Sequence, residues 1–260
     1  MVEICQSQLP YRPWEEERTR RLPGLNPVAA GEWLLRDDAY AAQMAHRRAL
    51  LDHKRDDVLR LDPMARRAAD ELLALVLEEI ARDPGYVIER GRVTCPDGYV
   101  VEVTPDAPLA TIGALVQEDM VIMQKQDDEH LLTGAVLCFP ASWSLAQKFM
   151  RPMTRIHAPV HVYTADLAKR VQRLFDGIRV DRPIWRANYL VYGDPELHQP
   201  RTEEDRRGVY QDGPKWLRVE RQAMRRLPIS DAVIFSIHTY VLSEAQLDAL
   251  GIEMPPPSGH

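Results

Sequence analysis

The spacing of apolar residues separates a helical first part of the chain from a strand-rich second part. Between Asp38 and Lys54, apolar side chains recur among basic ones with the spacing of an amphipathic helix. A second helix is predicted after Asp62-Pro63, because aspartate accepts the free first-turn amides and proline suits the first helical position. It ends at residues 83–85. Its predicted apolar face comprises Leu72, Leu73, Val76, Leu77 and Ile80.

After Gly85 the pattern becomes that of β-strands. The runs 86–93 and 99–103 flank Cys95-Pro96-Asp97-Gly98, whose proline and glycine favour a turn, so a hairpin is predicted. Strands that outnumber helices and can lie antiparallel predict an α+β fold with one curved sheet. The further predicted elements are strands at about 121–124, 130–139, 184–192, 216–223 and 231–241, and a helix at about 165–175.

The two ends of the chain have their own signals. Residues 8–31 contain four prolines and few apolar anchors, which predicts an irregular segment that wraps a surface. Ser243 with Gln246 three residues later has the form of a capping box, and Gly251 suits a helix C-terminus. A C-terminal helix with a frayed tail is therefore predicted. We divide the chain into 1–84, 85–242 and 243–260.

Composition excludes several classes of protein. A net charge of −6 gives no electrostatic case for a nucleic-acid or anionic-membrane surface. Three scattered cysteines argue against a disulfide framework and cannot hold a four-thiolate iron–sulfur cluster. There is no long apolar run, no secretory pattern and no glycine-rich nucleotide fingerprint. We expect a cytoplasmic protein that needs no membrane partner.

The stretch from Leu137 to Tyr163 is the strongest candidate for a site. Pro152 and Pro159 hold His157 on a constrained, non-helical segment. That imidazole could bind a metal or a haem iron, with Arg151 and Arg155 meeting anionic groups such as haem propionates. A single histidine specifies no metal geometry, so the residues alone favour a histidine that hydrogen-bonds local carbonyls.

Strand alternation defines a second group of candidates. Arg186 and Asn188 share one face of their strand, and Arg218 and Glu220 share one face of the next. An arginine and a carboxylate on an inner face would form a desolvated pair, which marks functional sites. The alternative is a salt bridge in water at a sheet edge. In the last strand, His238 alternates with Thr239 and shares its face with Ser236 and Tyr240.

Five spaced motifs carry a resemblance to a known family. They are PYRPW with GLNP and WLLRDDAY; FPASWSLAQKFMRPMTRIHAPV; RPIWRANYLV with LHQP; LRVERQAMRRLP; and VIFSIHTYVL. Together they resemble the α-subunit-like proteins of the haem-dependent oxidative N-demethylase family, from about Pro10 to Tyr240 and in the same order. The chain departs from the family pattern at His161, where proline is usual, and at His238, where another basic residue is usual.

The resemblance implies a haem-binding, PAS-like core at 85–242 and a monooxygenase-like oxidation of a small secondary amine such as dimethylamine. It makes His157 the leading iron ligand, with His161 as rival, and it adds Trp143 to the cofactor-binding residues Arg151 and Arg155. The catalytic candidates that it implies beside oxygen and substrate are Arg186, Asn188, Glu220, Arg221 and His238. If His238 lines that pocket, its protonation would vary near neutral pH.

The resemblance also implies partner subunits. FMN, a 2Fe-2S cluster, NADPH and folate would be bound by other chains, since this one lacks their motifs. The purified chain alone should therefore show slow or no NADPH-driven turnover. Two alternatives stay open: a non-catalytic haem-based sensor or ligand-binding protein of the same fold, and a family member that has lost haem.

Overall fold

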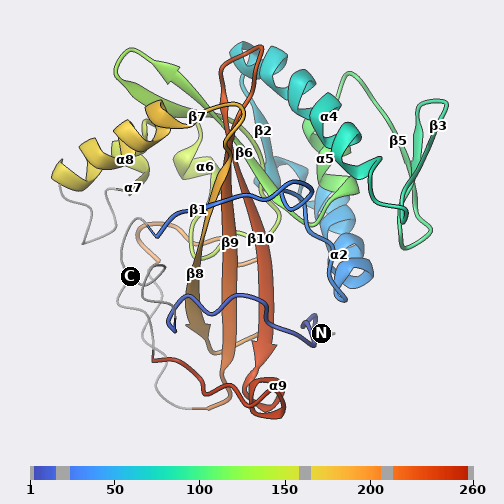
Figure 1. The fold of residues 1–260 in the computed structure, drawn as a ribbon, viewed down its shortest axis with the longest axis vertical. Helices are drawn as coiled ribbons and strands as arrows, with labels where there is room; N and C mark the ends of the chain where they lie inside the picture. Colours follow the sequence, from blue (N-terminus) through green and yellow to red (C-terminus); the bar gives the residue numbers. More distant parts are fainter. Residues whose placement is uncertain (1–2, 16–23, 158–164, 206–212, 257–260) are drawn as a thin grey trace.

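The computed structural model describes residues 3–15, 24–157, 165–205 and 213–256. A seven-stranded sheet runs through the protein, and every neighbouring pair of its strands is antiparallel (Figure 1). This confirms the predicted α+β class. In spatial order the strands are β1 (Asn26–Pro27), β8 (Ile184–Tyr192), β9 (Trp216–Arg226), β10 (Val233–Ser243), β6 (Asp119–Gln126), β7 (Glu129–Val136) and β2 (Leu59–Leu61).

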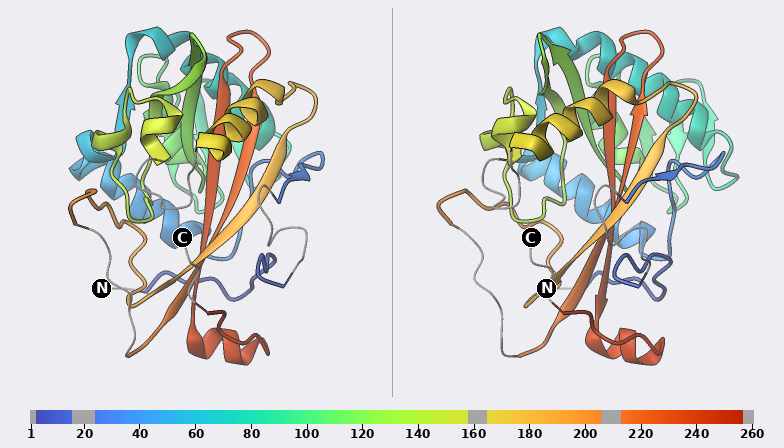
Figure 2. Two further views of the ribbon diagram at one scale, coloured as in Figure 1. Left: turned by 90° about the vertical axis from the view of Figure 1, so that its left-hand side faces the viewer. Right: turned by 60° about the vertical axis from the view of Figure 1, so that its left-hand side comes forward.

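Helices cover both faces of this sheet (Figures 1 and 2). The α8 face carries α6 (Leu145–Lys148), α7 (Met153–His157) and α8 (Ala165–Gly177). The α4 face carries α2 (Tyr40–His53), α4 (Arg66–Ile80) and α5 (Pro108–Leu115). Each face has its own apolar cluster: Phe175 packs with Met224 and Val233 on the α8 face, and Leu72 packs with Ile122 and Ile234 on the α4 face.

The predicted helix boundaries follow from local capping. The Asp62 carboxylate accepts the Met64 amide at 3.0 Å and starts the 3-10 turn η1 (Pro63–Ala65), which leads into α4. Ser243 and Gln246 form a complete capping box at α9 (Glu244–Ala249). Both predicted starts are confirmed. The short helix α3 (Arg55–Val58) follows α2 directly.

A separate three-stranded sheet differs from the predicted hairpin. It consists of β3 (Val87–Glu89), β4 (Arg92–Thr94) and β5 (Val100–Glu102). The predicted single strand 86–93 is broken because Arg90 and Gly91 both adopt positive φ, at 47° and 79°, and turn the chain back on itself. The predicted turn at residues 95–98 joins β4 to β5, with the Gly98 amide donating to the Cys95 carbonyl at 2.8 Å.

Helix α5 was not predicted, because six of its eight residues are buried and an almost wholly apolar segment shows no helical period. Gly113 lets this helix approach the sheet closely. A Cβ at that position would lie 2.5 Å from Cγ2 of Val136 in β7. Any larger residue would therefore push α5 away from β7.

Residues 3–15 form a segment that we call the N-terminal strap. It crosses the α4 face where β8, β9 and β10 extend beyond β6 (Figure 1). Leu9 is buried there, the Tyr11 ring lies 4.9 Å from the Trp185 ring, and Trp14 lies 5.2 Å from Tyr189. Residues 8–15 of the predicted irregular segment thus wrap a surface, whereas Asn26 and Pro27 of the same segment form strand β1 beside β8.

Candidate functional site

The register of the three long strands builds one row of polar residues on the α8 face. Asn188 of β8 lies opposite Glu220 of β9, and Glu220 lies opposite Thr239 of β10. Directly opposed residues in an antiparallel sheet have Cβ atoms about 5 Å apart and share a face. We call Asn188, Glu220 and Thr239 the polar row.

Two atoms of the polar row lack hydrogen-bond partners. The Asn188 Oδ1 and the Thr239 Oγ1 are both buried, and no described residue pairs with either. Glu220 lies between them and is itself 5% exposed. Because a buried polar atom without a partner is destabilising, such atoms call for a bound group or an ordered water. The row can therefore hold a polar ligand, and in particular a cation against the Glu220 carboxylate.

Glu220 is oriented by Arg218, which lies two residues earlier on the same face of β9. The Arg218 Nε lies 3.2 Å from Glu220 Oε1, with both side chains buried. The remaining guanidinium nitrogens donate to the Leu197 carbonyl at 3.0 Å and the Phe139 carbonyl at 2.5 Å. The Arg218–Glu220 ion pair is therefore desolvated. Of the two possibilities that the sequence left open, the buried pair is present and the salt bridge in water is not.

Arg186 lies on the same face, two residues before Asn188 in β8 and opposite Gln222 of β9. Gln222 donates to Glu220 Oε2 at 3.2 Å. Arg186 is half-buried and has no hydrogen-bond or ion-pair partner among the described residues. Burial lowers the pKa of its guanidinium, and the charge of Glu220 opposes that shift. Arg186 and the polar row thus lie together, as alternation predicted for Arg186 and Asn188.

The segment after β7 brings α7 to this face. The Asp119 carboxylate accepts the amides of Cys138 and Phe139 at 2.7 and 2.8 Å, which fixes the break after the strand. Farther along the chain, the Met150 amide donates to the Leu132 carbonyl of β7 at 2.8 Å, just before α7 begins. His157 is the last residue of α7, so the predicted non-helical backbone at this residue is wrong. Pro152 stands just before the helix, where a proline removes no intrahelical hydrogen bond. The side chain of His157, and all of its rival His161, lie outside the described residues.

The cofactor-binding candidates lie near α6 and α7. Trp143 packs against the apolar cluster of the α8 face, with the Lys148 amine 4.9 Å from its ring. Burial lowers the pKa of Lys148 to about 8, with Glu203 opposing and Arg155 adding to the shift. Arg155 is exposed and forms two hydrogen bonds to Glu203, at 2.8 and 2.9 Å. Arg151 is also exposed.

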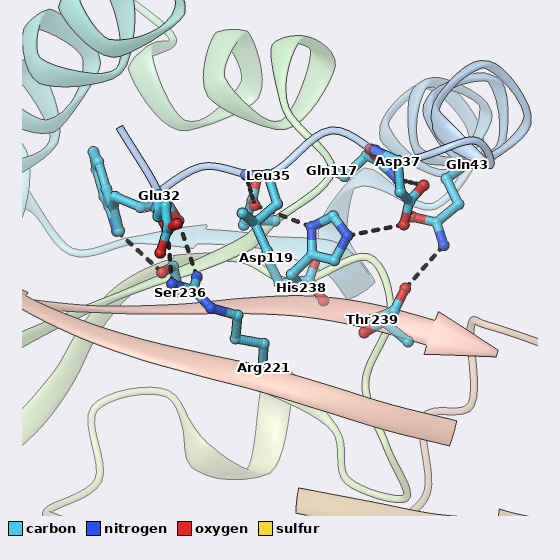
Figure 3. Close-up of polar contacts among 12 residues, drawn as sticks. Glu32, Leu35, Asp37, Gln43, Gln117, Asp119, Arg221, Ser236, His238 and Thr239 are labelled. Carbon is cyan, nitrogen blue, oxygen red and sulfur yellow. Dashed lines mark hydrogen bonds and ion pairs between the residues drawn. The ribbon is translucent and has the colours of Figure 1, made fainter. Parts of the chain in front are cut away.

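Arg221 and His238 lie on the face opposite the polar row. Figure 3 shows Arg221 bonded to Glu32 and His238 bonded to Asp37. Arg221 donates to the Glu32 carbonyl at 2.6 Å, and its guanidinium carbon lies 5.1 Å from the Trp185 ring. His238 Nδ1 lies 3.0 Å from Glu118 Oε1, and its Nε2 lies 3.0 Å from Asp37 Oδ2. The fold thus separates the five catalytic candidates into two groups, one on each face.

His238 is held as a cation. Carboxylates only accept hydrogen bonds, so two carboxylate partners require a proton on both ring nitrogens. Burial disfavours the charge, but the hydrogen bonds and charges of Asp37 and Glu118 outweigh it and raise the pKa of His238 to about 9. Burial also disfavours the Asp37 carboxylate, yet His238 keeps its pKa below the ordinary value. His238 therefore stays protonated near neutral pH, because it lies between two carboxylates.

This arrangement predicts a loss of stability in alkali. The folded pKa of His238 lies above its unfolded value of 6.5, so its contribution is complete below pH 6.5 and is lost as pH rises through about 9. The loss should be on the order of 3 kcal/mol. Urea unfolding between pH 6 and 10 would measure it. A His238→Gln variant should lack this slope, and an equal slope in both proteins would contradict the assignment.

Sequence reasoning missed Thr239, because its place in the polar row depends on the β9–β10 register, which is not visible in one strand alone. It also missed two half-buried histidines. His46 stacks on Phe139 at 5.6 Å, with its Nε2 3.2 Å from Glu196 Oε1. His198 Nδ1 lies 2.8 Å from the Cys138 carbonyl.

Other features of the described residues lie apart from the polar row. A cavity of about 370 Å³ opens between the strap, α2 and the 195–197 segment. No residue of the polar row lines it. Within the described ranges, no group of three or more His, Cys, Asp or Glu side chains could hold a metal ion. The three cysteines are free thiols, and none of the described helices has the length and apolar character to cross a bilayer. The cavity lining comprises Glu3, Ile4, Ala42, His46, Pro195, Glu196 and Leu197.

One comparison with known proteins bears on this site. The model of the family described as haem-dependent oxidative N-demethylase, alpha subunit-like, matches residues 24–254. The match includes every strand of the large sheet, α6 to α8 and the polar row. It begins after the N-terminal strap.

Proposed function

The chain belongs to the haem-dependent oxidative N-demethylase, alpha subunit-like family, and we propose on this premise that it binds haem and oxidatively demethylates a small secondary amine such as dimethylamine. The observation that carries the proposal is the polar row. It offers a buried carboxylate between two polar atoms that pair with no described residue, on the face that also carries α7. Such a row suits a small ammonium ion better than an apolar ligand.

The residues of the α8 face fit a haem group. His157 would bind the iron, with His161 as rival, because α7 ends on this face. Trp143 would pack on the macrocycle. Arg151 and Arg155 would meet the propionates, and Arg155 would exchange its bond to Glu203 for one to a propionate. The apolar cluster around Met153 and Phe175 would shield the group from water.

Bound haem would supply dioxygen binding and oxidation of the N-methyl carbon, after which hydrolysis of the iminium product releases formaldehyde. The balanced reaction consumes dimethylamine, O2, two electrons and two protons and gives methylamine, formaldehyde and water. Glu220 would bind the ammonium and accept its proton. Arg186 would stabilise negative charge that develops beside the amine, and Asn188 would orient the substrate.

Arg221 and His238 would act in a different way from these three residues. Both lie on the α4 face, so neither would touch substrate. Their packing against Trp185, Asp37 and Glu118 would hold the strands that carry the polar row. Arg221 and His238 would therefore support the pocket from the other side of the sheet and would not line it.

The electrons would come from partner subunits. The α-subunit-like family name supports such partners, and they would carry FMN, a 2Fe-2S cluster, NADPH and folate. No partner would be a nucleic acid or a membrane. The three free thiols support a cytoplasmic location. Fast NADPH-driven turnover by this chain alone would contradict this part of the proposal.

We assign the core to residues 85–242 and describe it as PAS-like. The central strands β7, β6, β10, β9 and β8 and the helical segment on their α8 face support this assignment. Residues 1–84 would be a helical extension packed on the core, and 243–260 a C-terminal helix and tail. The same core in a sensor would bind haem without demethylating an amine.

Haem absorption spectra test the proposal directly. Wild-type protein titrated with haemin should give a Soret band with one equivalent bound. His157→Ala should shift that band and weaken binding by about tenfold or more, because the iron loses its protein ligand. His161→Ala serves as the matched control and should leave the spectrum unchanged. The reverse pattern would move the ligand to His161, and no Soret band with wild-type protein would refute haem binding.

A further inference from the structure

The N-terminal strap completes the sheet at the place where β6 ends. Pairing between β6 and β10 stops at Asp119 and Ile237, so the following residues of β10 have a free edge. Gln6 occupies that edge. Its amide donates to the Val241 carbonyl at 3.1 Å, and its Oε1 accepts the Val241 amide at 2.8 Å. Gln6 is fully buried, and this one residue takes the place that a neighbouring strand would have beside Val241.

Gln6 and His238 share one carboxylate oxygen. Gln6 Nε2 donates to Asp37 Oδ2 at 2.8 Å, and His238 Nε2 donates to the same oxygen at 3.0 Å. Gln117 Nε2 donates to the other oxygen, Asp37 Oδ1, at 2.8 Å. The strap is therefore attached to the buried charge network rather than lying on the surface of the sheet.

The same glutamine holds the backbone of the polar row. Gln6 Nε2 lies 3.1 Å from the Thr239 carbonyl, and Gln43 Nε2 lies 3.0 Å from it. Thr239 follows His238 in β10, so its side chain points to the α8 face while the histidine points to the α4 face. Its neighbour across the sheet is Glu220. The strap and the charge network thus fix the strand segment that presents Thr239 to the proposed ligand.

We propose that Gln6, Asp37 and His238 are positioning residues that couple the N-terminal strap to the polar row. The inference rests on the proposed function, because it assigns the polar row to ligand binding. Gln6 lies before the matched residues 24–254, whereas Asp37 and His238 lie within them. Loss of the strap contact would let β10 shift and would misplace Thr239 beside Glu220.

Two measurements on the full chain test this coupling. Gln6→Ala should increase hydrogen–deuterium exchange at backbone amides 238–242, because the Val241 amide loses its acceptor. It should also weaken haemin binding by about fivefold or more, the usual lower range of coupling between sites, and broaden the Soret band. Asp37→Asn should act in the same direction. Gln8→Ala, an exposed glutamine of the same strap, should change neither measurement.

A control for general destabilisation separates positioning from a purely structural role. Val93→Ala removes a fully buried side chain from the small sheet and should leave haemin affinity and the exchange at 238–242 unchanged. Unchanged exchange in Gln6→Ala would refute the strap contact. Faster exchange with unchanged haemin affinity and Soret shape would refute positioning while the proposed function stands. No haemin binding by wild-type protein would refute the proposed function, and the positioning role with it.

Discussion

Replacing Glu220 with alanine should lower formaldehyde release by about 10²–10⁴-fold while haem content persists, since that range is typical of a lost general base. Glu220 is the carboxylate of the polar row. It lies between Asn188 and Thr239, each with a buried atom that has no partner in the described part of the chain. The measurement is formaldehyde from one turnover of the chemically reduced, haem-loaded protein mixed with dimethylamine and oxygen. Unchanged turnover would remove Glu220 from the mechanism.

The alanine variant also leaves the buried Arg218 without its ion-pair partner, so a second variant is needed. Glu220→Gln retains one oxygen for the Arg218 Nε, 3.2 Å away in the wild-type protein, and should be as inactive as alanine but more stable. Glu79→Gln is the matched control. Glu79 also pairs with an arginine of β9, Arg225, at 2.9 Å, but lies away from the polar row. Its turnover should remain that of the wild type.

Local sequence signals predicted several elements correctly because their causes are local. Residues 184–192 form β8 with the predicted bounds, and Ser243 and Gln246 form the predicted capping box. The break at Arg90 was missed because a positive φ at a residue other than glycine has no clear sequence signal. Helix α5 was missed because a nearly uniform apolar run has no period.

The candidate site was only half predictable for a related reason. Alternation within a strand placed Arg186 and Asn188 on one face, which the structure bears out. It could not show that Glu220 lies between Asn188 and Thr239, because that depends on two registers set by packing far along the chain. Motif resemblance grouped His238 with the pocket, although alternation and register place it on the other face.

Replacing Arg47 with methionine should cost about 3–5 kcal/mol of folding free energy, because it removes one partner of a buried ion pair. Arg47 is fully buried and lies 2.6 Å from Asp119 Oδ1. It also donates to the carbonyls of Gly113, Gln117 and Glu118 at 3.2, 3.1 and 2.9 Å. Thermal unfolding should show a midpoint lower by about 10 °C. Methionine keeps the bulk of the side chain, so the loss would report on charge and hydrogen bonding.

The same variant connects stability to the site. Asp119 fixes the chain break that leads to α6 and α7 through the amides of Cys138 and Phe139, and without Arg47 its charge would be buried and unpaired. We therefore expect weaker haemin binding together with the loss of stability. Arg66→Met is the matched control, because Arg66 pairs with Asp70 in an exposed salt bridge and should cost less than about 1 kcal/mol. Equal stability of the two variants would show that the Arg47–Asp119 pair does not support the fold. It would also contradict the inference that this pair holds α7 in place.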